Sequence, residues 1–313
     1  MAATSTEGGA RPRLALGPIG LWTGALDMVP ASRSRELAAE LEDLGYDAVW
    51  IPEVAGRDSF VHLTLLLGAT TRLVGATGIA NIWSRDAVAM AGGIKALTEA
   101  FPERALVGLG VSHRNLVDGL RGHHYDKPLT TMSAYLDAMD RAPYTAERPG
   151  TPVRRVLAAL GPKMLALSAE KADGAHPYFV NPEHTRRARE VLGTGPLLCP
   201  EQAVLLETDP AQARQIGRGY TAVYLSQPNY VNNIRRLGFS DDDMAAGGTD
   251  AFVDAMVAWG TLEQVQARVR EHFDAGADHV CIQPLGSGRR AVPDAQWREL
   301  APALAELGRA VRN

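Results

Sequence analysis

Two side chains that could transfer a proton stand directly after short apolar segments of this sequence. His176 lies in ADGAHPYFV, beside a proline and a tyrosine, and Glu53 follows the apolar run AVWIP. A neutral imidazole titrates near working pH, and a carboxyl group can serve as acid or base. A lone histidine is more often structural, and Glu53 could equally pair with an arginine. We take His176 and Glu53 as candidate catalytic residues.

The segment LGPKML predicts an anion site at the start of a helix. Gly161 can turn the chain and Pro162 suits the first helical position, where free backbone N–H groups attract anions. Lys163 adds a positive charge beside them, although a solvated lysine is the commoner outcome at such a position. A phosphate group is the natural ligand of this segment.

Two further segments place glycines where a buried strand usually has larger residues. They are GATGIANIW, with glycines at 75 and 78, and GLGVSHR, with Gly108 and Gly110 before Ser112. Glycine in a strand permits a bulge or the close approach of a ligand, but a bend that needs small residues explains it equally well. Ser112 adds a hydroxyl group and a backbone N–H.

Short apolar runs alternate with amphipathic segments along the chain, which is typical of βα units around a parallel sheet. We expect eight strands, over 13–21, 47–53, 72–83, 104–112, 153–160, 174–180, 196–208 and 279–285. The pattern predicts an α/β fold, a (β/α)8 TIM barrel, because it continues to eight units without change. A doubly wound sheet is the competing architecture.

Two irregular regions interrupt the repeat. An insertion over 113–130 follows the fourth strand, and a long region over 209–275 must hold extra helices between the seventh and eighth strands. We expect residues 1–12 to form a flexible leader and 13–313 a single domain. In such a barrel, function lies at the C-terminal ends of the strands, where the candidate residues fall.

Composition excludes several classes of function. The net charge of −4 gives no basic footprint for nucleic acid, and no apolar run of about 18 residues predicts a membrane span. The two cysteines, Cys199 and Cys281, stand in separate apolar segments, which favours buried thiols and a cytoplasmic location. No spacing indicates a metal site, and the nicotinamide, P-loop and hydrolase motifs are missing.

Several segments in a fixed order resemble the luciferase-like oxidoreductases, especially the branch that uses the deazaflavin coenzyme F420. They are LEDLGYDAVWIPE, RLVGATGIANIWSRD, FPERALVGLGVSH, LAALGPKMLALSAEKADGAHPYFVNPEHT and AGADHVCIQPLG. The resemblance covers about residues 14–285. It implies a barrel of the bacterial-luciferase type, a small-molecule substrate and a homodimer.

The resemblance also implies a set of site residues. A non-proline cis peptide of the family would correspond to the Gly78–Ile79 bond and press against the deazaflavin ring, with His176 the best candidate for proton transfer. The expected cofactor-binding residues are Gly78, Ile79, Ala80, Asn81, Trp83, Val111, Ser112, Gly161, Pro162, Lys163, Met164, Gly174 and Ala175. Of these, residues 161–164 would hold the phosphate and 111–112 would line the cofactor's tail.

The implied reaction is hydride transfer between F420 and a small organic molecule. It would reduce a C=C or C=N bond or oxidise an alcohol, with Glu53 or His176 as the acid or base. One alternative is an FMN-dependent monooxygenase of the same fold; another is a barrel that binds without catalysis. An electropositive groove for the F420 tail, formed by Arg114, Arg121, Lys127 and Lys163, would favour the deazaflavin. We expect the 113–130 insertion to form a lid over the pocket that determines the substrate. Because this region matches no fixed role, the resemblance does not predict which substrate is bound.

Overall fold

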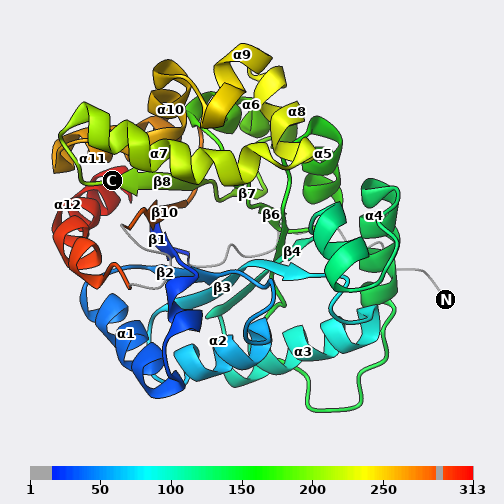
Figure 1. Cartoon of the computed structure of the whole chain (residues 1–313). Helices are drawn as coiled ribbons and strands as arrows, with labels where there is room; N and C mark the ends of the chain where they lie inside the picture. Colours follow the sequence, from blue (N-terminus) through cyan, green and yellow to red (C-terminus); the bar gives the residue numbers. More distant parts are fainter. Residues whose placement is uncertain (1–15, 287–291, 313) are drawn as a thin grey trace.

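The chain folds into a barrel of parallel strands surrounded by helices, shown in Figure 1. This computed structural model describes residues 16–286 and 292–312; the expected leader over 1–12 lies outside them. Neighbouring strands follow the order β7-β6-β5-β4-β3-β2-β1-β10-β8-β9. β7 pairs with β6, and β8 pairs with β10. The ring closes because β7 and β8 follow each other directly along the chain. The predicted TIM-barrel architecture is confirmed.

The strands are shorter than the apolar runs that predicted them. Their bounds are β1 Ile19–Trp22, β2 Ala48–Ile51, β3 Val74–Asn81, β4 Ala105–Gly110, β5 Arg155–Leu157, β6 Gly174–Ala175, β7 Leu197–Leu198, β8 Glu201–Leu205, β9 Val257–Trp259 and β10 Val280–Pro284. All pair in parallel. Each expected strand is therefore present, but with different ends.

Prolines explain two of these differences. The expected strand over 174–180 ends at Ala175, and the one over 196–208 divides into β7 and β8 around Pro200. A proline has no N–H for the strand ladder, so Pro177 and Pro200 interrupt it. The sequence analysis also missed β9, which lies within the region expected to be mostly helical and pairs with β8.

The helices follow the predicted alternation. They are α1 Ala31–Asp43, α2 Ser59–Leu67, α3 Ala87–Ala100, α4 Pro128–Asp140, α5 Pro162–Lys171, α6 Pro182–Leu192, α7 Pro210–Leu225, α8 Pro228–Arg236, α9 Asp241–Met244, α10 Asp250–Met256, α11 Leu262–Asp274 and α12 Asp294–Arg312, with short turns η1 Ala25–Met28, η2 Asn115–Leu120 and η3 Ala245–Gly247. Side chains cap many starts, such as Asp58 and Asp86. The extra helices expected between the seventh and eighth strands are α7 to α10.

The barrel interior is a packed core of inward-facing side chains. Trp50 on β2 fills its centre and is completely buried. Its indole N–H donates to Nε2 of His279 at 3.0 Å, and the His279 ring is bound in turn to the backbone oxygen of Gly17. These bonds satisfy the polar side-chain atoms of Trp50 and His279.

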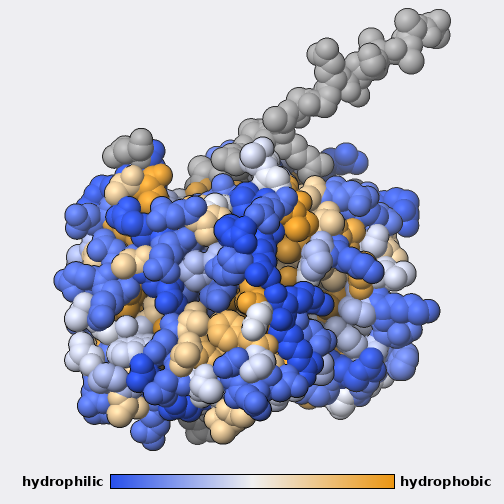
Figure 2. Space-filling model, turned by 90° about the horizontal axis from the view of Figure 1, so that it is seen from above, coloured by the Kyte–Doolittle hydropathy of each residue, from blue (hydrophilic) through white to orange (hydrophobic). Residues whose placement is uncertain are grey.

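The face of the molecule seen from above is mainly polar (Figure 2). Figure 2 shows one side on which hydrophilic residues surround small apolar groups. Among the described residues, no helix combines the length and the apolar character required to cross a membrane.

Close backbone packing under the site gives a test of the fold. A Cβ atom on Gly174 would lie 2.0 Å from the backbone oxygen of Leu197 on β7. We expect Gly174→Ala to lower the free energy of unfolding by about 2–3 kcal/mol, because the strand pair must move apart. Gly195→Ala is the matched control, since a Cβ there meets nothing within 4 Å. Chemical denaturation measures both; equal stability of the two variants would contradict the packing of β6 on β7.

Candidate functional site

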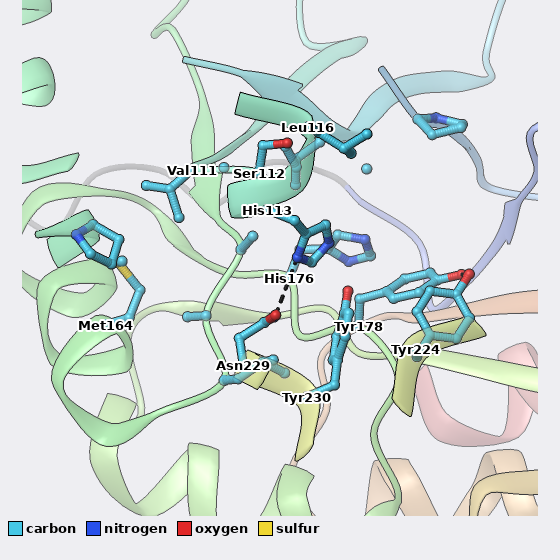
Figure 3. A pocket seen from close by; sticks show the side chains of 18 of the residues that line it. Val111, Ser112, His113, Leu116, Met164, His176, Tyr178, Tyr224, Asn229 and Tyr230 are labelled. Carbon is cyan, nitrogen blue, oxygen red and sulfur yellow. Dashed lines mark hydrogen bonds between the residues drawn. The ribbon is translucent and has the colours of Figure 1, made fainter. Parts of the chain in front are cut away.

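A cavity of about 460 Å³ opens at the C-terminal ends of the strands. Its wall is mostly apolar and aromatic, and Figure 3 shows side chains from several elements pointing into it. Of the predicted site residues, the wall contains Glu53, Gly78, Ile79, Val111, Ser112, Gly161, Met164 and His176. The structure thus brings together residues at the ends of four strands, β2, β3, β4 and β6, and at the start of α5.

One wall of the cavity is the bulged end of β3. The Gly78–Ile79 peptide bond is cis, as expected, and the register of β3 on β4 shifts between Thr77 and Ala80. A Cβ on Gly110 would lie 2.4 Å from Cδ1 of Ile79, and one on Gly108 would lie 2.2 Å from the backbone oxygen of Thr77. The two glycines of GLGVSHR therefore leave the space that the bulge occupies.

His176 lies directly against this wall. A Cβ on Gly78 would be 3.1 Å from Nε2 of His176 and 2.3 Å from Nε1 of Trp22. His176 is only 1% exposed and its ring stacks on Trp50 at a centroid distance of 4.3 Å. Its Nδ1 lies 2.7 Å from the backbone oxygen of Cys199. Within the described part of the chain, Nε2 of His176 and Nε1 of Trp22 have no hydrogen-bond partner.

These contacts define the state of the His176 ring. Burial lowers its pKa to about 4, and the bond to the Cys199 oxygen only partly opposes the shift. The ring is therefore neutral near pH 7. Because a carbonyl oxygen can only accept, Nδ1 carries the proton and Nε2 presents a lone pair. His176 can accept a proton or a hydrogen bond from a group in the cavity.

Glu53 lines the cavity, but its oxygens are already engaged. They form an ion pair with Arg85 and accept a hydrogen bond from the backbone N–H of Asn81 at 2.8 Å. Ser59 donates to the same carboxylate through its backbone N–H at 3.3 Å and its hydroxyl at 3.2 Å. This geometry favours the alternative in which Glu53 pairs with an arginine and holds the end of β3 in place.

Several predicted cofactor-binding residues lie behind the wall rather than in it. Asn81 accepts from the backbone N–H of Trp83 at 3.0 Å, and the Trp83 indole donates to the backbone oxygen of Val111 at 3.0 Å. Ala80 packs in the apolar core. Gly174 and Ala175 form β6, and the backbone N–H that follows them, that of His176, donates to Leu157 at 2.8 Å. These residues position the wall.

The other end of the cavity is the predicted anion site. Gly161 is the N-cap of α5, and no side chain caps this helix. Pro162 and Lys163 are exposed in its first turn, whereas Gly161 and Met164 face the cavity. The positive end of the helix and the absence of a side-chain cap favour a phosphate here.

Arg236 completes this end and was missed by the sequence analysis. It is the last residue of α8 and lines the cavity, and its Nη1 would lie 3.5 Å from a Cβ on Gly161. Its neighbour Arg235 pairs with Asp241. Arg236 forms no such pair with any described residue. An unpaired guanidinium beside a helix N-terminus suits bidentate binding of a phosphate.

Two of the four cations expected to form an electropositive groove, Arg114 and Lys127, lie near a carboxylate. Arg114 pairs with Asp118 at 3.4 Å, and Lys127 lies 4.0 Å from a carboxylate oxygen of Asp126. Arg121 donates to the backbone oxygen of Val54 at 2.8 Å. Paired charges present little net field to a ligand, so Arg236 is the better candidate for an anion contact.

The third wall of the cavity is aromatic and comes largely from the helical region after β8. Tyr224 lies in the last turn of α7, Tyr230 lies in α8, and both pack near Tyr178. The amide oxygen of Asn229 lies 3.2 Å from Nδ1 of His113, the bond drawn in Figure 3. No motif marks these helical residues, so the spacing along the chain could not reveal them. The 113–130 insertion also contributes to the wall, through Leu116 and Tyr125.

The described residues hold no group of three histidine, cysteine or acidic side chains placed to bind a metal ion.

Comparison with known proteins assigns the chain to a family. A family model described as luciferase-like monooxygenase matches residues 14–279. The chain belongs to the luciferase-like monooxygenase family. The bulged β3 with its cis peptide, the neutral histidine and the uncapped α5 are therefore features of a luciferase-like protein.

Curated relatives of this luciferase-like chain extend over its length. A protein of Mycobacterium tuberculosis named as a coenzyme F420-dependent oxidoreductase is 26% identical, and the match covers 84% of this chain and 94% of the relative. A 5,10-methylenetetrahydromethanopterin reductase of Methanolobus tindarius is also 26% identical, covering 85% of this chain and 96% of the relative.

Solved structures share the fold. An F420-dependent secondary alcohol dehydrogenase, solved with an F420–acetone adduct, gives a TM-score of 0.72 at 15% identity over 92% of this chain and 99% of that one. The F420-dependent tetrahydromethanopterin reductase of Methanopyrus kandleri gives a TM-score of 0.71 at 17% identity over 93% of this chain and 98% of that one. An FMN-bound Baeyer–Villiger monooxygenase of Pseudomonas putida gives a TM-score of 0.66 at 15% identity over 94% of this chain and 98% of that one.

The lowered pKa of His176 predicts part of the acid sensitivity of this protein. Its folded pKa of about 4 lies below the ordinary 6.5, so its stabilising contribution is complete above 6.5 and is lost as the pH falls through 4. We expect His176→Asn to reduce the loss of unfolding free energy over this range by on the order of 3 kcal/mol. Denaturant titrations at each pH measure it, with exposed His124→Asn as control. If the unfolding free energy of His176→Asn depended on pH as that of the unmodified protein does, this result would contradict a neutral, buried ring.

Proposed function

We propose that this chain is a coenzyme F420-dependent oxidoreductase that transfers a hydride between the deazaflavin and a small organic substrate. The proposal rests on one observation. A single cavity extends from the bulged end of β3, where Gly78 and Ile79 lie beside His176, to the unpaired guanidinium of Arg236 at the start of α5. A ring with a phosphate-bearing tail fits these two ends. The name of the curated relative from Mycobacterium tuberculosis supports F420 as that group.

The residues present fit such a cofactor. Two buried polar atoms, Nε2 of His176 and Nε1 of Trp22, are aimed at the Gly78 wall without partners in the described chain. A Cβ on Gly78 would fill this space. At the other end, Arg236 and the first turn of α5 would hold the phosphate, while Val111 and Ser112 lie along the cavity between the two ends. When bound, F420 would supply the hydride chemistry.

The side chains around the wall define what the protein itself contributes. The apolar lining excludes water from the substrate, and the Gly78–Ile79 wall fixes the plane on which a ring can rest. His176 holds a lone pair at Nε2 and can take a proton from an alcohol that is being oxidised. In the opposite direction, reduction of a C=C or C=N bond, the protein must supply a proton instead.

An FMN-dependent monooxygenase of the same fold is the second candidate, because an FMN-bound structure shares this architecture. FMN also carries a phosphate, so the anion site alone does not separate the two cofactors. The Mycobacterium tuberculosis relative, whose name includes F420, favours the deazaflavin. Homodimerisation and a cytoplasmic location stay predictions, tested by sedimentation and by fractionation.

Cofactor titration tests the proposal directly. We expect saturable binding of F420 to the purified protein, followed by ring absorbance, and much weaker binding of FMN. Gly161→Asp places a carboxylate at the N-cap of α5, where it would repel the phosphate, so F420 binding should be lost or strongly reduced. Preference for FMN would move the function to oxygen-dependent monooxygenation, and failure of both cofactors to bind would favour a non-catalytic barrel.

The role of Arg236 can be separated from general charge effects. Arg236→Ala should weaken F420 binding about 10- to 100-fold, the effect of losing a charged hydrogen bond. Arg235→Ala is the matched control, because this neighbour pairs with Asp241 and does not line the cavity. Fluorescence titration gives both dissociation constants. Equal weakening in the two variants would show that Arg236 contributes only to the general field.

A further inference from the structure

Tyr230 reaches the aromatic wall of the cavity from the first turn of α8. The buried residues of this helix are Tyr230, Asn233 and Ile234, which recur at the spacing of one helix face. That face packs in an apolar cluster between the helices and β8. Tyr230 is 8% exposed and lines the cavity. Figure 3 shows its ring pointing from α8 into the cavity, towards the strand ends that carry His176 and Tyr178.

Neighbouring aromatic rings fix the position of the Tyr230 side chain. Its ring meets those of Tyr224 and Phe179 edge-on, at centroid distances of 5.3 Å and 5.6 Å. The ring of His113 lies 5.5 Å away on the cavity side of α8. Edge-to-face pairs of this kind are favourable contacts. The hydroxyl group therefore has a defined place before any ligand arrives, as a group that takes part in chemistry requires.

The two other tyrosines of this wall have already committed their protons. The Tyr178 hydroxyl donates to the side-chain oxygen of Gln283 at 2.6 Å. A hydroxyl group has one proton, so Tyr178 can only accept in its other bond. The Tyr224 hydroxyl, 2.5 Å from that of Tyr178, is therefore the donor between them. Neither group has a proton left for a ligand.

The Tyr230 hydroxyl forms no hydrogen bond with any described residue. Its oxygen is not fully enclosed by protein, so a molecule in the cavity can reach it. Burial raises the pKa of Tyr230 well above its ordinary value, and the hydroxyl therefore keeps its proton at neutral pH. Of the three tyrosines, Tyr230 is the one that can donate to a bound molecule.

We propose that Tyr230 is the proton donor of this site, and that its hydroxyl binds the oxygen or nitrogen atom of the substrate on which charge develops during reduction. The inference rests on the proposed function. It supplies what His176 lacks, because Nε2 of that ring has a lone pair and no proton to give. It also narrows the reduced substrates to C=N compounds and to C=C bonds conjugated with a carbonyl group, since an isolated C=C bond has no acceptor atom for the hydroxyl.

The step balances in atoms and electrons. The carbon of the C=N bond, or the far carbon of the conjugated C=C bond, gains a hydride from reduced F420, and the π electrons move to nitrogen or oxygen. That atom takes the hydroxyl proton of Tyr230, which gives an amine or an enol; the enol rearranges in water to the saturated carbonyl compound. The substrate is reduced by two electrons and the cofactor is oxidised, losing its second hydrogen as a proton to solvent. Tyr230 regains a proton from water that enters the cavity.

Nuclear magnetic resonance of the free protein tests the hydroxyl without cofactor or turnover. With tyrosines isotope-labelled at Cζ, each signal reports the hydrogen bonding of its own hydroxyl. Cyclohexanone, a ketone small enough for the cavity, should shift one signal in a saturable way, and that signal should be missing in Tyr230→Phe. Methylenecyclohexane has nearly the same shape but no oxygen, and should shift it much less. If no signal moved, or both compounds moved it equally, the proposal would be overturned.

A second measurement tests the transfer of the proton. With reduced F420 bound, cyclohexenone and the cyclic imine pyrroline should oxidise the cofactor on the order of 100-fold more slowly in Tyr230→Phe, the effect of losing a general acid. The dissociation constant of F420 should stay the same, because the hydroxyl contacts the substrate. Equal rates in the two proteins would overturn the role of Tyr230, and failure of the F420-bound, unmodified protein to use either compound would overturn the substrate class.

Tyr220→Phe is the matched control. Tyr220 lies in the same aromatic cluster, with its ring 4.9 Å from that of Tyr224, but its hydroxyl donates to Glu201 at 3.2 Å and it is not part of the cavity wall. This variant should keep both the rate and the response to cyclohexanone, and a loss equal to that of Tyr230→Phe would overturn the proposal. The comparison of the two ligands uses the unmodified protein, so it does not depend on how a variant folds. If F420 fails to bind, the proposed function fails, whereas the result on the free protein stands by itself.

Discussion

The chemistry of this site depends on one hydrogen bond, between Nδ1 of His176 and the backbone oxygen of Cys199. That bond places the ring proton on the side away from the cavity and leaves Nε2 as an acceptor. Trp50 supports the ring from below.

The cavity above this bond separates its polar groups by function. An acceptor, His176, lies beside the Gly78–Ile79 wall, a cluster of hydroxyls lies on the helical side, and cationic and helix-terminal donors lie at α5. The remaining lining is apolar, so each polar group acts in an environment that strengthens its interactions. A ligand with a flat ring and an anionic tail can use the acceptor and the cationic end at once, which leaves the hydroxyl side for a second, smaller molecule.

Much of this arrangement follows from local patterns in the sequence. The strand order and the barrel follow from the repeated βα units, and the anion site follows from Gly-Pro at the start of a helix, because these signals depend on neighbouring residues. The resemblance to the family indicated the cis bond at Gly78–Ile79. The ends of the strands were less predictable, since single prolines within apolar runs decide them.

The remaining features depend on contacts between distant segments. Glu53 binds Arg85, 32 positions away, and only the fold shows that its oxygens are occupied. Arg236, Tyr224 and Tyr230 reach the cavity from helices whose sequence carries no motif. β9 is three residues long and is defined by pairing with β8. The sequence showed that Gly108 and Gly110 are unusually small for a buried strand. Only the fold shows why: larger residues would collide with the β3 bulge at Thr77 and Ile79.

The crystal structure of the protein with F420 tests the central claim most directly. The deazaflavin ring should lie on the Gly78–Ile79 wall within hydrogen-bond distance of Nε2 of His176 or Nε1 of Trp22. The phosphate should contact the first turn of α5 and the guanidinium of Arg236. A ring bound elsewhere, or a phosphate held away from α5, would contradict the assignment of this cavity as the cofactor site.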